Sequence, residues 1–172
     1  MTREEFALFA MALKTYYPKE NILPNEQAME LWLRQIGDIP YKVAETALNK
    51  WVAFNKWSPA ISDIREMASE ILNGEIPDWG EAWKEVTEAI RSFGSYRPQE
   101  ALQSMSPLTR EAVERMGFVN ICQSENPSAE RANFRLIYES LSQRHKKDCM
   151  ISPNLKNMIE SVSQKMLEVS DV

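Results

Sequence analysis

The feature that most constrains this chain is the recurrence of apolar residues every three or four positions, between breaks made by proline, glycine and capping residues. It is clearest over residues 37–67, where two amphipathic stretches flank a corner of three residues, Asn55-Lys56-Trp57. Before the corner, apolar residues follow at spacings of four, four and three: Val43, Ala47, Trp51 and Phe54. Such residues share one face of a helix. Because period-two alternation is absent, the sequence predicts an all-α fold.

Each of these two stretches opens with an oxygen-bearing side chain followed by proline. Asp38 precedes Pro40, and Ser58 precedes Pro59. Such a side chain can accept hydrogen bonds from the first turn, where proline is tolerated because its missing N–H would have no partner within the helix. We therefore expect Asp38 and Ser58 to cap the two helices.

Three further helix starts carry clear capping signals. Thr2 is followed by Glu5 at the spacing of a capping box. Asn25 and Asp78 each precede an apolar stripe of helical spacing. Together with the remaining proline and glycine breaks, these signals predict about nine helices.

The strongest internal break is Gly74 followed by Pro77, a helix-ending glycine and then a residue that cannot continue the helix. The sequence therefore predicts a four-helix N-terminal domain over residues 1–73. A linker over residues 74–78 and a helical C-terminal domain over residues 79–172 follow.

The charge balance bears on the kind of partner. The net charge is −5, whereas phosphate contacts require a basic surface, so duplex DNA is not the expected partner. No apolar run reaches the roughly 18 residues of a membrane span. The first residues, MTREEF, carry two glutamates where a signal peptide carries positive charge. We expect a cytoplasmic protein that does not contact a membrane.

Catalytic and metal-binding patterns are weak in this sequence. His145 is the single histidine, and Cys149 lies four residues later. A structural zinc site needs four ligands, and no second pair is present. Five scattered glycines form no phosphate-binding motif. We therefore expect no catalytic residues, no metal and no cofactor, and a protein that is not an enzyme.

A basic surplus lies on the predicted helix over residues 128–147. Between residues 131 and 147 only Glu139 opposes five cations: Arg131, Arg135, Arg144, Lys146 and Lys147. These residues could bind an acidic protein surface or single-stranded nucleic acid, with Tyr138 available for stacking. The alternative is a solvated face near a helix C-terminus, where cations are favourable in any case.

Tryptophan is the other candidate for partner contact. Trp79 and Trp83 lie one turn apart on a stripe, a spacing that favours core packing. Trp57 lies in the corner instead. Burial between the two helices and contact with a partner are both open for its side chain.

The order of several short motifs resembles a known family. Those in the first half are Tyr17-Pro18, Trp32-Leu33, Asp38-Ile39-Pro40-Tyr41 and the run from Asn55 to Arg65; those in the second include Ser106-Pro107-Leu108, Gly117-Phe118, Cys122-Gln123-Ser124-Glu125-Asn126 and Arg131-Ala132-Asn133-Phe134. Together they resemble the loader and inhibitor family of replicative helicases encoded by phages and prophages of Gram-positive bacteria. The typical corner has Phe-Pro where this chain has Trp57 and Ser58.

This resemblance implies a small helical adaptor without enzymatic activity. Its partner would be the hexameric DnaB-type helicase, which the adaptor would hold inactive and deliver to origin DNA. An origin-binding initiator protein is a further candidate partner. Shorter family members have a flexible C-terminal part that contacts the helicase. Because the second half here is capped and amphipathic, we expect it to be folded. A single-stranded nucleic-acid-binding protein is the alternative.

Overall fold

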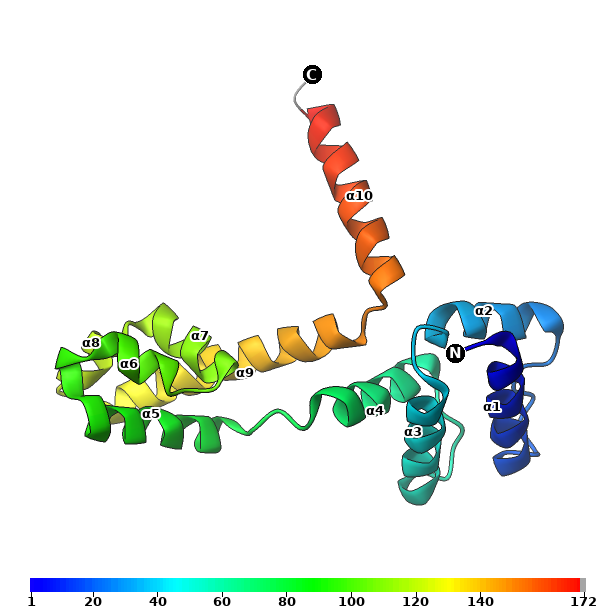
Figure 1. The fold of residues 1–172 in the computed structure, drawn as a ribbon, viewed down its shortest axis with the longest axis horizontal. Coiled ribbons are helices and arrows are strands. Elements are labelled where there is room, and N and C mark those ends of the chain that lie inside the picture. Colours follow the sequence, from blue (N-terminus) through cyan, green and yellow to red (C-terminus); the bar gives the residue numbers. More distant parts are fainter. Residues whose placement is uncertain (171–172) are drawn as a thin grey trace. The chain divides into compact units, whose positions relative to one another are not determined.

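All regular secondary structure in the described part of the chain is helical. The computed structural model describes residues 1–170, with side chains as far as residue 164. These residues form ten α-helices and one short 3₁₀ helix, without a strand (Figure 1). The all-α prediction is confirmed, with ten helices against about nine expected. One difference is α8 (Phe118–Gln123), a six-residue helix that is too short to show helical periodicity in sequence.

The chain divides into two compact units. The first unit contains residues 1–75 and the residues from Lys146 on, and the second unit contains Ile76–His145. The boundary near residue 145 falls inside α9 (Pro127–Met150), so this helix contributes to both units. The domain bounds expected from sequence, 1–73, 74–78 and 79–172, stay a prediction.

Four helices build the N-terminal part of the first unit: α1 (Arg3–Tyr16), α2 (Glu26–Ile36), α3 (Tyr41–Phe54) and α4 (Ile61–Asn73). Their core contains Phe6, Phe9, Leu13, Ile36, Leu48 and Ile64. Thr2 forms the expected capping box with Glu5, and the Asn25 side chain accepts from the N–H of Ala28. The local signals for these two helix starts are thus confirmed.

The expected caps Asp38 and Ser58 are wrong. Pro40 occupies the N-cap position of α3 and makes no side-chain cap, and the N-cap position of α4 is Ala60. Asp38 accepts instead from Arg65, over 2.8 and 3.0 Å. Ser58 donates its N–H, over 3.3 Å, and its hydroxyl to the Glu20 carboxylate. The Asp38 and Ser58 side chains therefore bind residues that are distant in sequence, and neither caps the helix for which its local sequence predicted it.

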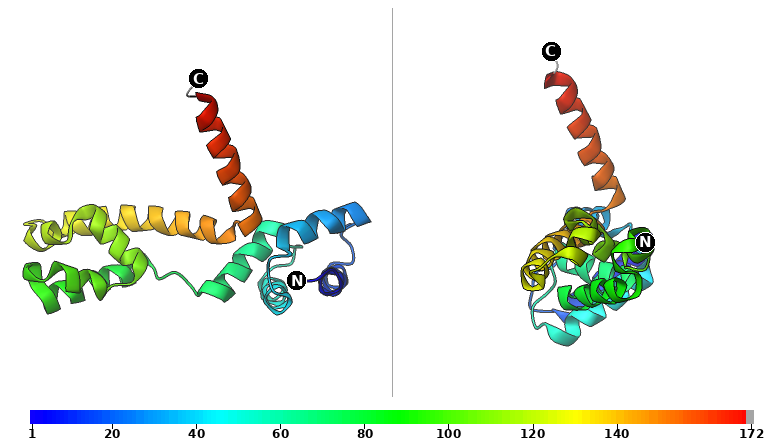
Figure 2. Two further views of the ribbon diagram at one scale, coloured as in Figure 1. Left: turned by 45° about the horizontal axis from the view of Figure 1, so that its top comes forward. Right: turned by 90° about the vertical axis from the view of Figure 1, so that its left-hand side faces the viewer.

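The second unit is built from α5 (Trp79–Phe93), η1 (Gly94–Tyr96), α6 (Pro98–Gln103), α7 (Pro107–Met116), α8 and the part of α9 up to His145. Within it, α5 and α9 lie side by side in both Figure 1 and Figure 2. Asp78 caps α5 as expected. The Trp83 ring lies 5.1 Å from that of Phe134, which confirms core packing for this tryptophan.

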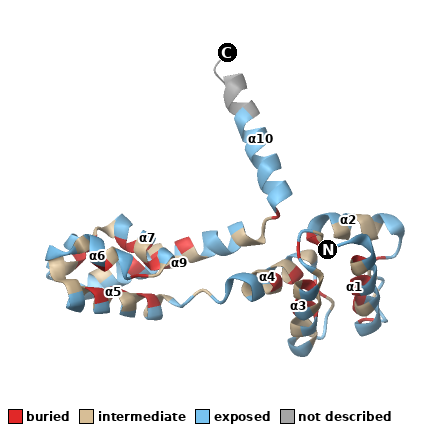
Figure 3. Cartoon of the chain, in the orientation of Figure 1, coloured by how far each residue is buried: buried red, intermediate tan, exposed pale blue. Residues whose placement is uncertain are grey.

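The last helix, α10 (Pro153–Ser170), belongs to the first unit. Ser152 caps it, since its hydroxyl accepts from the N–H of Leu155 over 3.2 Å. Just before it, the carbonyl of Met150 at the end of α9 accepts from Arg65 Nε. The described side chains of α10, from Pro153 to Gln164, are exposed (Figure 3).

Candidate interaction surfaces

Two of the cations expected on a free basic face are stacked on Trp79. The guanidinium carbons of Arg131 and Arg135 lie 5.1 and 5.0 Å from the centre of the Trp79 ring. The four-residue spacing on α9 places both above the first residue of α5, and an aromatic face attracts such cations. Arg135 Nε also donates to Glu139 over 2.8 Å. These arginines already have partners in their own unit, which weakens the prediction that they bind another molecule.

Tyr138 is not available to a partner, so its prediction as a contact residue is wrong. Its side chain is 2% exposed and its ring lies 5.5 Å from that of Phe134. Its hydroxyl donates to the carbonyl of Pro77 over 3.0 Å. Burial, followed by the charge of Glu85, raises the pKa of this phenol. Tyr138 is therefore part of the core of the second unit, and its ring is not accessible for stacking with a nucleic-acid base.

The remaining basic candidates are exposed. Arg144 lies near the end of the second unit, and Lys146 and Lys147 lie at the start of the returning segment of the first unit. Contact of these three side chains with a partner stays a prediction.

The corner between α3 and α4 presents aromatic rings to solvent. Trp57 is 67% exposed and Phe54 is 81% exposed. Lys56 Nζ lies 5.5 Å from the centre of the Trp57 ring. Of the two possibilities for Trp57, burial of the indole is therefore excluded. We call Phe54, Lys56 and Trp57 the corner surface.

The backbone beneath the corner surface is held from several sides. Trp51 Nε1 donates to the carbonyl of Trp57 over 2.8 Å, and the Tyr17 hydroxyl donates to that of Asn55 over 3.4 Å. Burial and the neighbouring Glu20 raise the pKa of Tyr17. The exposed rings therefore stand on a fixed backbone, which lowers the entropic cost of presenting them to a partner.

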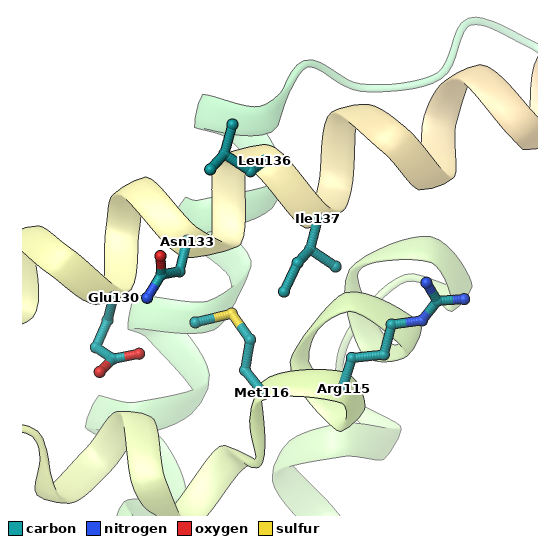
Figure 4. A pocket seen from close by; sticks show the side chains of 6 residues that line it. All are labelled: Arg115, Met116, Glu130, Asn133, Leu136 and Ile137. Atoms are coloured by element: carbon teal, nitrogen blue, oxygen red, sulfur yellow. The ribbon is translucent and has the colours of Figure 1, made fainter.

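Sequence reasoning missed a pocket between α7 and α9 in the second unit (Figure 4). It measures about 310 Å³ and is lined by Arg115, Met116, Glu130, Asn133, Leu136 and Ile137. Its charged lining residues have partners, since Arg115 pairs with Glu111 over 2.8 Å and Glu130 accepts from Ser124 over 3.0 Å. The sequence offered only the adjacent apolar pair Leu136-Ile137 as a signal, and of this pair Leu136 is 67% exposed.

Among the described residues, no group of three or more His, Cys, Asp or Glu side chains is arranged to hold a metal ion. In the same part of the chain, no helix has the length and apolar character to cross a membrane.

Comparison with known protein families gives a match to the N-terminal part of the chain. Residues 1–65 match the family model for the N-terminal domain of gp39P, a phage helicase loader and inhibitor. The chain is similar to that domain over α1, α2, α3, the corner surface and the first turn of α4. No curated protein and no solved structure matched the chain. The match includes Trp57 but stops before the second unit, so the resemblance seen in the second half stays a prediction.

Proposed function

We propose that this chain is a phage replication adaptor that binds the replicative hexameric helicase and controls its loading or activity by protein–protein contact. The observation that carries the proposal is the match of residues 1–65 to the gp39P N-terminal domain, which is associated with phage helicase-interacting proteins. On this proposal the chain acts in the bacterial cytoplasm and catalyses no reaction itself.

The corner surface supports this proposal and is its first candidate contact. It lies within the matched residues and combines two exposed aromatic rings with a cation. Protein interfaces are enriched in aromatic side chains and centre on a few of them. The acidic balance of the chain, −5, also suits a protein partner better than a nucleic acid.

The test is a binding experiment with the purified full-length chain and a DnaB-type helicase from a Gram-positive host. We expect a complex that coelutes in size-exclusion chromatography. We also expect a change in the rate of ATP hydrolysis by the helicase, because an adaptor that controls loading must favour one helicase state. Absence of a complex, together with an unchanged ATPase rate, would overturn the proposal.

The alternative is single-stranded nucleic-acid binding through the exposed cations Arg144, Lys146 and Lys147. It requires an affinity for single-stranded DNA that falls steeply with salt, since each phosphate contact releases counterions. Loss of that affinity on changing Lys146 and Lys147 to glutamate, with no helicase complex, would favour this alternative.

A further inference from the structure

A small pocket between α1 and α3 of the first unit combines apolar and polar lining residues. It measures about 100 Å³. Phe9 and Leu48 of the hydrophobic core form part of its apolar lining. Its polar lining consists of Tyr16 from α1 and of Tyr41, Glu45 and Asn49 from α3. Sites for whole small molecules usually measure roughly 300–1,000 Å³, so this pocket suits the end of a single side chain.

The polar lining offers mainly hydrogen-bond acceptors. The Tyr41 hydroxyl donates to Glu45 Oε1 over 3.1 Å, and the Tyr16 hydroxyl donates to Asn49 Oδ1 over 3.0 Å. A phenol carries a single hydroxyl proton, so both protons are already used. Among these four residues, the Asn49 amide is the group that retains side-chain donors. The pocket therefore suits a guest that donates hydrogen bonds.

A cation of this chain already lies beside two of the lining residues. Lys42 Nζ lies 3.1 Å from Glu45 Oε2 and 5.7 Å from the centre of the Tyr41 ring. The hydrogen bonds from Lys42 and then Tyr41 hold the pKa of Glu45 below its usual value, so this carboxylate is charged at neutral pH. The Lys42 side chain is 84% exposed, and such a surface pair contributes little stability. A guest cation can therefore displace it.

The combination of tyrosine rings and a carboxylate favours a guanidinium as the guest. A guanidinium is planar, stacks on aromatic faces and presents several N–H donors to a carboxylate. An ammonium group is a compact, strongly hydrated charge without a face to stack. Arginine is also enriched at the contacts that dominate protein interfaces. All the residues named in this pocket lie within the segment 1–65 that matches the family model.

We propose that the pocket between α1 and α3 receives an arginine side chain of the protein that this chain binds. In this arrangement Glu45 is the counter-ion of the guanidinium, and Tyr16 and Tyr41 supply aromatic contacts. The identity of the partner, the replicative helicase, rests on the proposed function above. The contact is separate from the corner surface and shares no residue with it.

The preference for a guanidinium is tested first without the helicase. The probe is N-acetyl-arginine methylamide, added to the full-length ¹⁵N-labelled chain and followed by NMR. We expect saturable shifts at Tyr16, Tyr41, Glu45 and Asn49. The corresponding citrulline compound has nearly the same shape but no charge, and is expected to bind at least ~10-fold more weakly. Equal affinity for the two compounds, or shifts confined to other residues, would overturn the proposal.

Substitutions then test the role of the carboxylate. Glu45→Gln keeps the shape of the side chain, removes its charge and is expected to lower the affinity for the arginine compound at least ~10-fold. The matched control is Glu26→Gln, at an exposed carboxylate on α2 of the same unit, which should change it less than about twofold. Lys42→Ala removes the competing ammonium and should raise the affinity about threefold. Unchanged binding by Glu45→Gln, or equal loss in the control, would contradict the proposal.

The same variants in the helicase complex separate this inference from the proposed function. Glu45→Gln is expected to weaken the complex about tenfold in titration calorimetry, whereas Glu26→Gln should leave its affinity unchanged. If the parent chain forms no complex, the proposed function fails. If the parent chain forms a complex that Glu45→Gln leaves unchanged, the proposed function stands and the arginine contact is refuted.

Discussion

Arg65 connects three segments of the first unit through one side chain. Its Nη1 donates to the carbonyl of Gln35 over 2.6 Å, its two Nη atoms bind both Asp38 oxygens, and its Nε donates to the carbonyl of Met150. Burial raises the pKa of Asp38, but the hydrogen bonds and charge of Arg65 outweigh it, so the net shift is downward. A two-pronged pair of this kind fixes geometry as well as charge.

We expect Asp38→Asn to destabilise the first unit at neutral pH, by about 1–2 kcal/mol, because it removes one charged partner of Arg65. The folded-state pKa of Asp38 lies below the unfolded value of about 4. The contribution is therefore complete above that unfolded value and is lost as pH falls through the folded one. Urea denaturation at several pH values should show the variant approaching the parent protein under acid conditions.

The exposed carboxylate Glu88, in the second unit, provides the control. Glu88→Gln should leave first-unit stability unchanged at every pH, within about 0.5 kcal/mol. A difference between the Asp38→Asn protein and the parent that stays constant down to pH 2 would show that ionisation of Asp38 does not contribute.

Whether the role of a capping candidate could be predicted depended on how far along the sequence its hydrogen-bond partner lies. Thr2, Asn25 and Asp78 cap as their local sequence predicts, because each accepts from an N–H within three residues. Asp38 and Ser58 carry the same local signal, but their partners are Arg65 and Glu20, respectively 27 and 38 positions away. Local sequence carries no information on such pairings.

At the scale of elements, the corner between α3 and α4 uses backbone groups for folding and leaves its aromatic side chains accessible to a partner. Its backbone is fixed by hydrogen bonds from Trp51 and Tyr17, while its rings are turned to solvent. Substituting an exposed ring therefore tests recognition with little effect on folding.

We expect Trp57→Ala to weaken the helicase complex by about 2 kcal/mol, roughly 30-fold, as the loss of a central aromatic contact does. Titration calorimetry or surface plasmon resonance would measure it. Because the hydrogen bond from Trp51 goes to the backbone of residue 57, the melting temperature should change little. Tyr96→Ala, a substitution at a 94% exposed ring in the second unit, is the control and should bind normally. Equal affinity of both variants would place the helicase contact elsewhere.

Element-level predictability is clearest on α9. Tyr138 lies four residues after Phe134 and three before Leu141, and all three are buried. Spacings of four and three put these residues on one face of a helix, so the core position of Tyr138 was predictable from sequence. The stacking of Arg131 and Arg135 on Trp79 was not, because it depends on how α5 and α9 pack.

At the scale of the whole molecule, the described residues build two separate cores that share no residue. Phe9 belongs to the core of the first unit and Val113 to that of the second. Phe9→Ala, expected to cost about 3–5 kcal/mol, should accelerate amide exchange in first-unit peptides. Val113→Ala should accelerate exchange in second-unit peptides. Hydrogen exchange with mass spectrometry would test this, and equal acceleration throughout the chain after either substitution would contradict it.

The contact between Arg65 and the carbonyl of Met150 has a consequence for synthesis of the chain. Because the first unit includes residues from Lys146 on, the second unit is an insertion within it. On the ribosome, α1 to α4 emerge first and can collapse around their own core. Until the second unit has been translated, Arg65 Nε lacks the Met150 carbonyl as its acceptor. Completion of the first unit is therefore a late event in the biosynthesis of this protein.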